Sequence, residues 1–263
     1  MFSIVVPIYH GTTSIELARC ISSIENQTYK NYELILVLDG LVMPDVIKLI
    51  SELTFKKIVL QLKDNSGPGI ARNEGVKYAS FDLIVIMDSD DFSIPERLDM
   101  AHKTFSNTNA DIYCSSIQEF DFKLNKALSI KRGFPYKNPY KIEYLFSPIN
   151  NVSVIIKKET LLRLGGYPNL KYGEDFVLWA KALISNTSVH HDESITVLVD
   201  ISNGFNKRRL NDFFIKEIAL LKMLRKAGYF NLYHCASRLM LRMIQRVIQP
   251  LLGYRIRLII SKM

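Results

Sequence analysis

Residues 82–91 read Asp82-Leu83-Ile84-Val85-Ile86-Met87-Asp88-Ser89-Asp90-Asp91, an apolar run that ends in three carboxylates within four positions. The apolar part does not alternate with polar residues, which is typical of a strand buried on both faces of a parallel sheet. Carboxylates this close together repel one another and disfavour regular structure. The sequence therefore predicts a central strand that stops where this acidic cluster (Asp88, Asp90 and Asp91) begins.

Three similar apolar runs precede this strand, and a predicted helix follows each of them. The runs are Ser3 to Ile8, Glu33 to Leu38 and Lys57 to Leu62. The predicted helices run from a capping box at Thr13 to about Asn26, from Pro44 to Leu53 and from Ile70 to Ala79. Strands that alternate with helices in this way predict an α/β fold with a parallel sheet, open to a ligand at the carboxyl ends of its strands.

The pattern is less regular after a helix that is expected to begin at Pro95. Strands are predicted at Asp111 to Ile117 and Val152 to Ile156, and one or two more within Val189 to Val199. From Asn211 onward the pattern is helical. We therefore expect a catalytic domain over residues 1–206 and a helical extension over residues 207–263.

Composition places the protein among globular intracellular proteins. Hydrophobic residues make up 48% of the 263, and the three cysteines are widely spaced without a Cys-x-x-Cys pair. That spacing favours neither a disulfide framework nor a zinc site, and it suits a reducing cytoplasm. No stretch reaches the roughly 18 apolar residues of a membrane span, and the first residues resemble a strand rather than a signal peptide.

The positive charge is concentrated at one end of the chain. Net charge is +8, and residues 229–263 hold five arginines, one lysine and no acidic residue. This asymmetry argues for a basic appendage rather than for a nucleic-acid-binding protein. An apolar stripe runs beside the arginines, through Leu239, Ile244, Val247, Leu251 and Leu252, and Pro250 is expected to break the helix. Such a helix suits the surface of an anionic membrane; the alternative is a helix packed on the catalytic domain with its arginines in water.

The acidic cluster has two interpretations. Carboxylate oxygens at the end of a buried strand suit a hard divalent cation such as Mg²⁺ or Mn²⁺, which neutralises charge on a departing diphosphate. The alternative is a solvated acidic turn in which Asp91 caps the next helix. The cluster by itself does not decide between them.

Several segments, in this order, resemble the family 2 glycosyltransferases of the GT-A fold. They cover about residues 2 to 200 and comprise Ile4-Val5-Val6-Pro7-Ile8-Tyr9, Glu33 to Gly40, Asn65 to Asn73, Met87 to Asp91, Pro95 to Leu98, Leu164 to Tyr167 and Gly173 to Trp179. The resemblance implies a Rossmann-like nucleotide-binding sheet flanked by helices. It further implies an enzyme of the bacterial surface-polysaccharide type.

The resemblance also implies roles for the residues that would hold the donor. Pro7 and Tyr9 would line the nucleotide pocket, and Asp39 would accept a hydrogen bond from the base, typically uracil. Arg72 would approach the base or the diphosphate, and Asp88 the ribose or sugar. The metal ligands would be Asp90, Asp88 and, on a weaker similarity, His190, with Mg²⁺ or Mn²⁺ as the ion.

Glu174-Asp175 resembles the acidic pair that supplies the family's catalytic base. The chemistry requires a carboxylate that takes the proton of the acceptor hydroxyl, and we assign that role to Asp175 with Glu174 as helper. The alternative is that both merely suit a helix N-terminus. Trp179 lies one turn further along, either to stack on a sugar or to pack in the core.

The resemblance implies inverting transfer of a sugar from a nucleotide-diphosphate donor, which we expect to be a UDP-sugar. The acceptor would be a hydroxyl of a glycan or lipid-linked saccharide in O-antigen or capsule synthesis, at the cytoplasmic face of the inner membrane. The sequence departs from the family in one segment. Many relatives have an aromatic-aromatic-Arg segment whose Arg lies near the diphosphate, but this chain has Leu198 to Gly204 there. Arg208 or Arg209 would have to take the place of that Arg. The alternatives are a sugar-nucleotide nucleotidyltransferase and a non-catalytic nucleotide-sugar-binding subunit.

Overall fold

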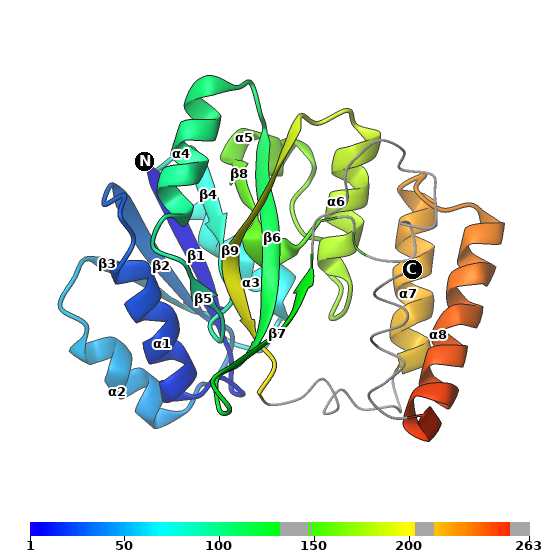
Figure 1. The fold of residues 1–263 in the computed structure, drawn as a ribbon, viewed down its shortest axis with the longest axis horizontal. Coiled ribbons are helices and arrows are strands. Elements are labelled where there is room, and N and C mark those ends of the chain that lie inside the picture. Colours follow the sequence, from blue (N-terminus) through cyan, green and yellow to red (C-terminus); the bar gives the residue numbers. More distant parts are fainter. Residues whose placement is uncertain (132–146, 148, 203–212, 253–263) are drawn as a thin grey trace.

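The computed structural model describes residues 1–131, 147, 149–202 and 213–252 (Figure 1). The strands are β1 Phe2–Ile8, β2 Tyr32–Leu38, β3 Lys57–Gln61, β4 Leu83–Ile86, β5 Phe92–Ser93, β6 Ile112–Asp121, β7 Lys126–Lys131, β8 Ile155–Lys157 and β9 Val189–Asp200. The helices are α1 Ser14–Glu25, α2 Pro44–Glu52, α3 Pro68–Lys77, α4 Arg97–Asn107, the 3-10 helix η2 Asn151–Ser153, α5 Lys158–Arg163, α6 Glu174–Ile184, α7 Phe213–Lys226 and α8 Leu232–Leu252.

The first four strands form the predicted parallel sheet. β1 pairs in parallel with β2 on one side and β4 on the other, and β2 pairs in parallel with β3. The amino terminus of β1 lies at the upper edge of the sheet in Figure 1, so the carboxyl ends of these strands meet at the lower edge. The polar residues that follow β1, β2 and β4 therefore gather there, as the sequence predicts.

The second half of the sheet is mixed rather than parallel. The sheet order is β3-β2-β1-β4-β8-β6-β9-β5 with β7 beside β6, and β8 runs antiparallel to both β4 and β6. Val189 to Asp200 is one long strand, and two strands were not predicted. β5 is too short to leave a pattern, and β7 exposes Leu128 and Ile130 instead of burying an apolar face.

Helices cover both faces of the sheet. On one face α1, α2 and α4 pack on the even-numbered residues of β1 and β2, such as Ile4, Leu34 and Leu36. On the other face α3, α5 and α6 pack on the odd-numbered residues, such as Val5 and Ile35. Because successive strand residues point to opposite faces, the continuous apolar runs of the sequence supply both cores. The expected fold class is confirmed.

Arg97, at the start of α4, connects β4, the strand before the acidic cluster, to the 3-10 helix η2. Its guanidinium is 1% exposed and donates to the carbonyl oxygens of Ile86 and Val152 at 2.9 and 2.8 Å. Burial lowers the pKa of Arg97 to about 10, so the side chain is charged at neutral pH. A buried cation with carbonyl acceptors fixes the carboxyl end of β4. The helix begins at Arg97, two residues after the Pro95 that was expected to open it.

The C-terminal helices form a hairpin, α7–α8, that packs against α6 at the right of Figure 1. Residues of α6, α7 and the turn between α7 and α8 share one apolar cluster, comprising Phe176, Val177, Ala180, Leu220, Leu221, Leu224, Tyr229 and Phe230. Arg238 is 2% exposed and donates to Glu217, itself fully buried, at 2.6 Å. The alternative expectation that the arginines lie in water is therefore wrong for Arg238. The helix also continues through Pro250 to Leu252, so the expected break at Pro250 is wrong: the proline removes the hydrogen bond of its own N–H without ending the 21-residue helix there.

The surface of the hairpin is partly apolar. Exposed large apolar side chains on it are Ile215, Ile218, Leu232, Tyr233, Met240 and Leu241. No helix in the described part of the chain combines the length and the apolar character needed to cross a bilayer. The division at residue 206 stays a prediction, since residues 203–212 lie outside the described residues.

Candidate active site

The acidic cluster forms a compact group of oxygens. A carboxylate oxygen from each of Asp88, Asp90 and Asp91 lies within 4.8 Å of the others. Asp91 is buried, Asp88 is half-buried and Asp90 is exposed. Close packing of protein around the carboxylates, and then the charges of their neighbours, raise the pKa of Asp90 to about 7 and the pKa of Asp91 well above its usual value. This crowding of negative charge is relieved by a cation.

Backbone and side-chain bonds from three elements hold the cluster in place. The hydroxyls of Thr12 and Ser89 lie 3.0 Å apart, joining the loop after β1 to the cluster. Arg19 of α1 donates to the carbonyl oxygen of Asp90 at 2.6 Å and pairs with the carboxylate of Asp200. The backbone N–H of Asp200 in turn donates to Asp91 at 2.9 Å. The end of β9 is thereby fastened to the acidic cluster.

Arg72 of α3 joins the acidic cluster to the acidic pair of α6. Its guanidinium is 4% exposed, and it donates to Asp88 at 2.6 Å and to Glu174 at 3.1 Å. It also lies 5.3 Å from the centroid of the Tyr167 ring. The guanidinium of Arg72 thus brings together three segments that the sequence singled out: the segment of Arg72 itself, the acidic cluster and the acidic pair. Arg72 holds two carboxylates, rather than standing free for a base or diphosphate.

Asp39, at the end of β2, orients the loop that leads into α3. One carboxylate oxygen accepts the N–H of Ser66 at 2.7 Å and the other accepts the N–H of Gly67 at 2.9 Å. Gly67 has φ of +94°, a conformation that only glycine adopts without strain. Asp39 therefore fixes the turn from which Arg72 emerges, and a contact with a nucleotide base stays a prediction.

Pro7 and Tyr9 lie at the carboxyl end of β1, as predicted. Pro7 is half-buried, whereas the Tyr9 side chain is 48% exposed. The ring of Tyr9 lies over Gly11, where a Cβ atom would be only 2.5 Å from the ring. An accessible aromatic face next to the acidic cluster suits the stacking of a base.

The two residues of the acidic pair have different surroundings. Glu174 is 7% exposed and paired with Arg72, whereas Asp175 is half-buried without an ion pair among the described residues. Burial raises the pKa of Asp175, and the negative charge of Asp88 adds to the effect. Burial and the charge of Asp175 raise the pKa of Glu174 too, against the opposing effect of Arg72. A carboxylate with a raised pKa is a better proton acceptor.

The prediction that His190 is a ligand of this metal site is wrong. Asp200 at the end of β9 touches the cluster, and His190 lies ten residues earlier in the same strand. That separation corresponds to roughly 30 Å along a strand, and β9 indeed starts at the upper edge of the sheet in Figure 1. His190 instead stacks on Tyr113, with ring centroids 6.2 Å apart.

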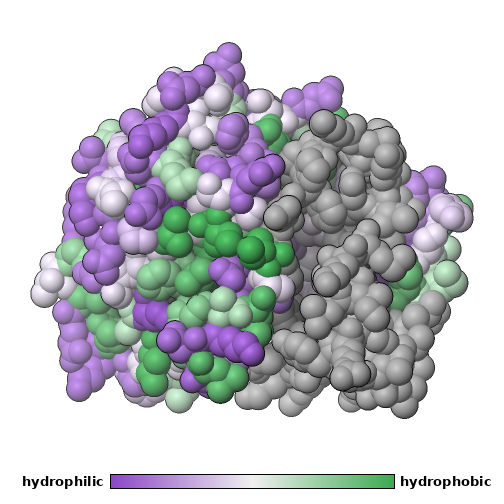
Figure 2. Space-filling view, in the orientation of Figure 1, coloured by the Kyte–Doolittle hydropathy of each residue, from purple (hydrophilic) through white to green (hydrophobic). Residues whose placement is uncertain are grey.

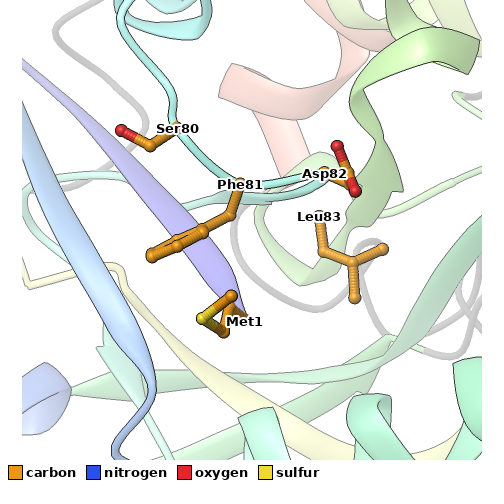
Figure 3. A pocket seen from close by; sticks show the side chains of 5 residues that line it. All are labelled: Met1, Ser80, Phe81, Asp82 and Leu83. Atoms are coloured by element: carbon orange, nitrogen blue, oxygen red, sulfur yellow. The ribbon is translucent and has the colours of Figure 1, made fainter.

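Two other features do not belong to the site. Trp179 is fully buried against Tyr167 in the core, so it is not available to a sugar. A surface hollow is lined by Met1, Ser80, Phe81, Asp82 and Leu83 (Figure 3). It lies where β1 and β4 begin, at the opposite edge of the sheet from the acidic cluster.

Sequence reasoning missed Arg19, Thr12 and Asp200. A single arginine or threonine inside a helix or loop carries no pattern, and only the chain's return along β9 brings Asp200 to the cluster. Arg19 also stacks on Phe122, 3.6 Å from its centroid. The Phe122 ring also contacts the rings of Phe92 and Phe120. Figure 2 shows a group of apolar residues near the middle of the face turned to the viewer. Arg208 and Arg209 lie outside the described residues.

The sequence pattern of Glycosyl transferase family 2 matches residues 3–164 of the chain, which include nearly all of β1, the acidic cluster and Arg72. The chain belongs to glycosyl transferase family 2. Two relatives span most of it. It is 24% identical over 239 residues to the amylovoran biosynthesis glycosyltransferase AmsE of Erwinia amylovora, covering 88% of this chain and 89% of that one. It is 27% identical over 254 residues to the UDP-Gal:alpha-D-GlcNAc-diphosphoundecaprenol beta-1,3-galactosyltransferase of Escherichia coli, covering 94% and 91%.

Solved structures of this family's fold superpose on the chain. S. aureus TarS 1-349 in complex with UDP-GlcNAc gives a TM-score of 0.68 at 20% identity, covering 90% of this chain and 70% of that one. The mannosyltransferase PcManGT from Pyrobaculum calidifontis, in complex with GDP-Man and Mn²⁺, gives 0.62 at 15% identity, covering 88% and 64%. These likenesses support the GT-A fold of the sheet and its flanking helices.

The raised pKa of Asp175 predicts how an uncharged variant compares with the wild type. The native state holds the Asp175 proton more tightly than the unfolded chain does. The stability that this group contributes is therefore complete below the unfolded pKa of about 3.9 and is lost as pH rises through the native value. Asp175→Asn should gain in relative stability between pH 4 and pH 8, measured as the difference in melting temperature. A difference that stays constant, or that moves in favour of the wild type, would contradict the assignment.

Proposed function

We propose that this family 2 glycosyltransferase transfers a sugar from a UDP-sugar to a hydroxyl of a glycan or lipid-linked saccharide, with inversion at the anomeric carbon. The observation that carries the proposal is the double ion pair of Arg72, which spaces Asp88 and Glu174 across one guanidinium. A donor held at the acidic cluster would then lie next to the acidic pair of α6. Two carboxylate groups with separate tasks are what transfer to a hydroxyl requires.

The names of the relatives support the choice of donor and acceptor. One relative is named as a UDP-galactose transferase acting on a diphosphoundecaprenol-linked sugar, and another as an enzyme of amylovoran biosynthesis. Exposed Tyr9 beside the cluster suits a nucleotide base. We propose a role in surface-polysaccharide synthesis of the O-antigen or capsule kind, carried out at the cytoplasmic face of the inner membrane.

The acidic cluster fits a divalent cation of the Mg²⁺ or Mn²⁺ kind. Its three carboxylates supply hard oxygen ligands within 4.8 Å of one another, and the pKa values of Asp90 and Asp91 are raised, first by loss of hydration and then by neighbouring negative charge. Asp88 and Asp90 would hold the ion, while Asp91 is already engaged by the N–H of Asp200. When bound, the ion supplies charge neutralisation for the departing nucleoside diphosphate.

Asp175 is proposed to act as the general base. The acceptor hydroxyl forms a new C–O bond to the anomeric carbon as the bond from that carbon to the diphosphate oxygen breaks. The hydroxyl proton passes to a carboxylate oxygen of Asp175, and the nucleoside diphosphate leaves with the bonding electrons. Glu174 is held by Arg72 at 3.1 Å, so its help consists in fixing Arg72 between the two acidic groups.

Removal of Asp90 tests the metal assignment. Asp90→Ala removes one oxygen ligand, and we expect it to abolish Mn²⁺-dependent stabilisation by UDP and sugar transfer while leaving the fold intact. The measurement is a thermal-shift titration of UDP, with and without Mn²⁺ and with EDTA, across a panel of nucleotide sugars. Metal-dependent UDP binding that survives in Asp90→Ala would remove Asp90 from the metal site.

Replacement of the base tests the catalytic assignment. Asp175→Asn should lower kcat by roughly 10²- to 10⁴-fold, the usual contribution of a general base, with unchanged UDP binding. Glu159→Gln is the matched control, because Glu159 is an exposed acid in the first turn of α5, and it should retain wild-type turnover. Wild-type kcat in Asp175→Asn would exclude Asp175 as base.

The same assay separates the alternative functions. A transferase releases a nucleoside diphosphate, whereas a nucleotidyltransferase exchanges pyrophosphate. A non-catalytic subunit would bind the donor without releasing either product. Membership of glycosyl transferase family 2 favours the first outcome.

We also propose that the outer surface of the α7–α8 hairpin contacts an anionic membrane. Tyr233 and Met240 are 71% and 54% exposed on α8 and lie seven residues apart, on one face of the helix. Exposed Arg225 and Lys226 end α7 beside it, and basic residues next to an apolar face suit anionic lipid.

Substitution of exposed residues is the appropriate test, since deletion of α8 would leave the buried Glu217 without Arg238. The double variant Tyr233→Ser, Met240→Gln should bind phosphatidylglycerol-containing vesicles at least about tenfold more weakly, because two large apolar side chains no longer enter the lipid. Raised salt should weaken wild-type binding. Leu124→Gln, at a 73% exposed position in the β6–β7 turn, is the control. Equal binding by the double variant would contradict the proposal.

A further inference from the structure

The helix turn that carries Glu174 and Asp175 lacks the usual means of fixing its own start. Its N-cap is Gly173, which has φ of +72° and no side chain to accept a hydrogen bond from the first turn. A side-chain acceptor at the N-cap, such as Thr13 of α1, satisfies a backbone N–H of the first turn. A catalytic base must nevertheless lie within hydrogen-bond reach of its substrate. Other contacts must therefore hold this turn.

Those contacts come from the α7–α8 hairpin on the amino-terminal side of the acidic pair. The three atoms closest to where a Cβ of Gly173 would lie all belong to Leu220 of α7, the nearest at 2.8 Å. Leu220 is 1% exposed. Gly173 thus allows α7 to approach the backbone directly before Glu174, at a distance that a larger residue would prevent.

The carboxyl-terminal side of the pair is held by the same hairpin. Phe176 is buried in the cluster shared by α6 and α7, and the guanidinium of Arg238 lies 4.9 Å from the centroid of its ring. Arg238 is itself fixed by the buried carboxylate of Glu217, at 2.6 Å. An ion pair removed from water holds its geometry only when both partners stay in place.

We propose that the α7–α8 hairpin is a positioning element of the active site, in which Leu220 against Gly173 sets the placement of Asp175. The hairpin contacts the residues immediately before and after the acidic pair, while Arg72 holds Glu174 from the side of the donor. The inference rests on the proposed function of Asp175 as base. It gives the C-terminal region a role in turnover in addition to any contact with a membrane.

Two leucines of α7 allow a matched test. Leu220 and Leu224 are one helical turn apart and both buried in the same cluster, but Leu224 is not among the atoms nearest Gly173. Leu220→Ala and Leu224→Ala should lower the melting temperature by similar amounts. Leu220→Ala should in addition lower kcat roughly ten- to a hundredfold through misplacement of the base, with the donor KM within about twofold of the wild type. Leu220→Met, which keeps the bulk, should restore kcat.

Amide hydrogen exchange gives a readout that does not depend on turnover. Exchange at residues 174–177 should be faster in Leu220→Ala than in Leu224→Ala, because only the first variant frees the start of α6. Equal exchange there, or equal loss of kcat in the two variants, would show that the hairpin contributes stability alone and would overturn the inference. Absence of transfer in the wild type, or full activity of Asp175→Asn, would instead contradict the proposed function, and the exchange comparison would still decide whether Leu220 holds this turn. Should Leu220→Ala fail to fold, Leu220→Val removes a single methylene and permits the same comparison with Leu224→Val.

Discussion

The buried guanidinium of Arg72 is the constraint around which the site is arranged. A charge that is 4% exposed needs counter-charges within hydrogen-bond distance, and Arg72 finds them in Asp88 after β4 and Glu174 at the start of α6. Removing one partner of such a pair costs about 3–5 kcal/mol, because the other charge is left uncompensated. The loop fixed by Asp39 and the strand end fixed by Arg97 keep Arg72 and Asp88 in register. The fold and the site consequently share one set of interactions.

The sequence was most informative where one physical rule acted alone. Unbroken apolar runs such as residues 33–38 predicted β1 to β4, since both faces of a parallel sheet are buried, and the carboxyl ends of those strands predicted where Asp39 and Asp88 would meet. Reasoning from the sequence failed for β5 and β7, where the first is two residues long and the second is exposed. It failed for His190 because the sequence does not say which end of β9 lies at the acidic cluster. Asp200, at the far end of the strand from His190, is the residue that contacts it. Arg19 and the pairing of Arg72 with Glu174 depend on contacts between distant segments, which no local pattern encodes.

Charge counting misjudged the C-terminal region for a related reason. Six basic residues without an acidic residue among them predicted a solvated helix face that binds an anionic membrane. Arg238 instead points into the protein, where it contacts Glu217 and Phe176. The glutamate lies in α7, before the stretch that was counted, so a count restricted to residues 229–263 could not reveal that Arg238 has a buried acidic partner. Exposed apolar residues such as Tyr233 and Met240 then become the better argument for a membrane contact. Separate faces of α8 serve the catalytic domain and the outer surface.

The site also carries more negative charge than Arg72 neutralises. The acidic cluster and the acidic pair together contain five carboxylates, and Arg72 pairs with two of them, Asp88 and Glu174. The pKa values of Asp90, Asp91, Glu174 and Asp175 are all raised, first because the protein around each carboxylate displaces hydrating water and then because of neighbouring negative charge. At the acidic cluster, this imbalance favours a divalent cation over an anion arriving alone, so a diphosphate would bind best together with the cation. At Asp175, the same imbalance favours uptake of a proton. Arg72 lies between the acidic cluster and the acidic pair. The excess negative charge on its two sides thus suits the two tasks of sugar transfer, which are holding a cation with the diphosphate and accepting a proton.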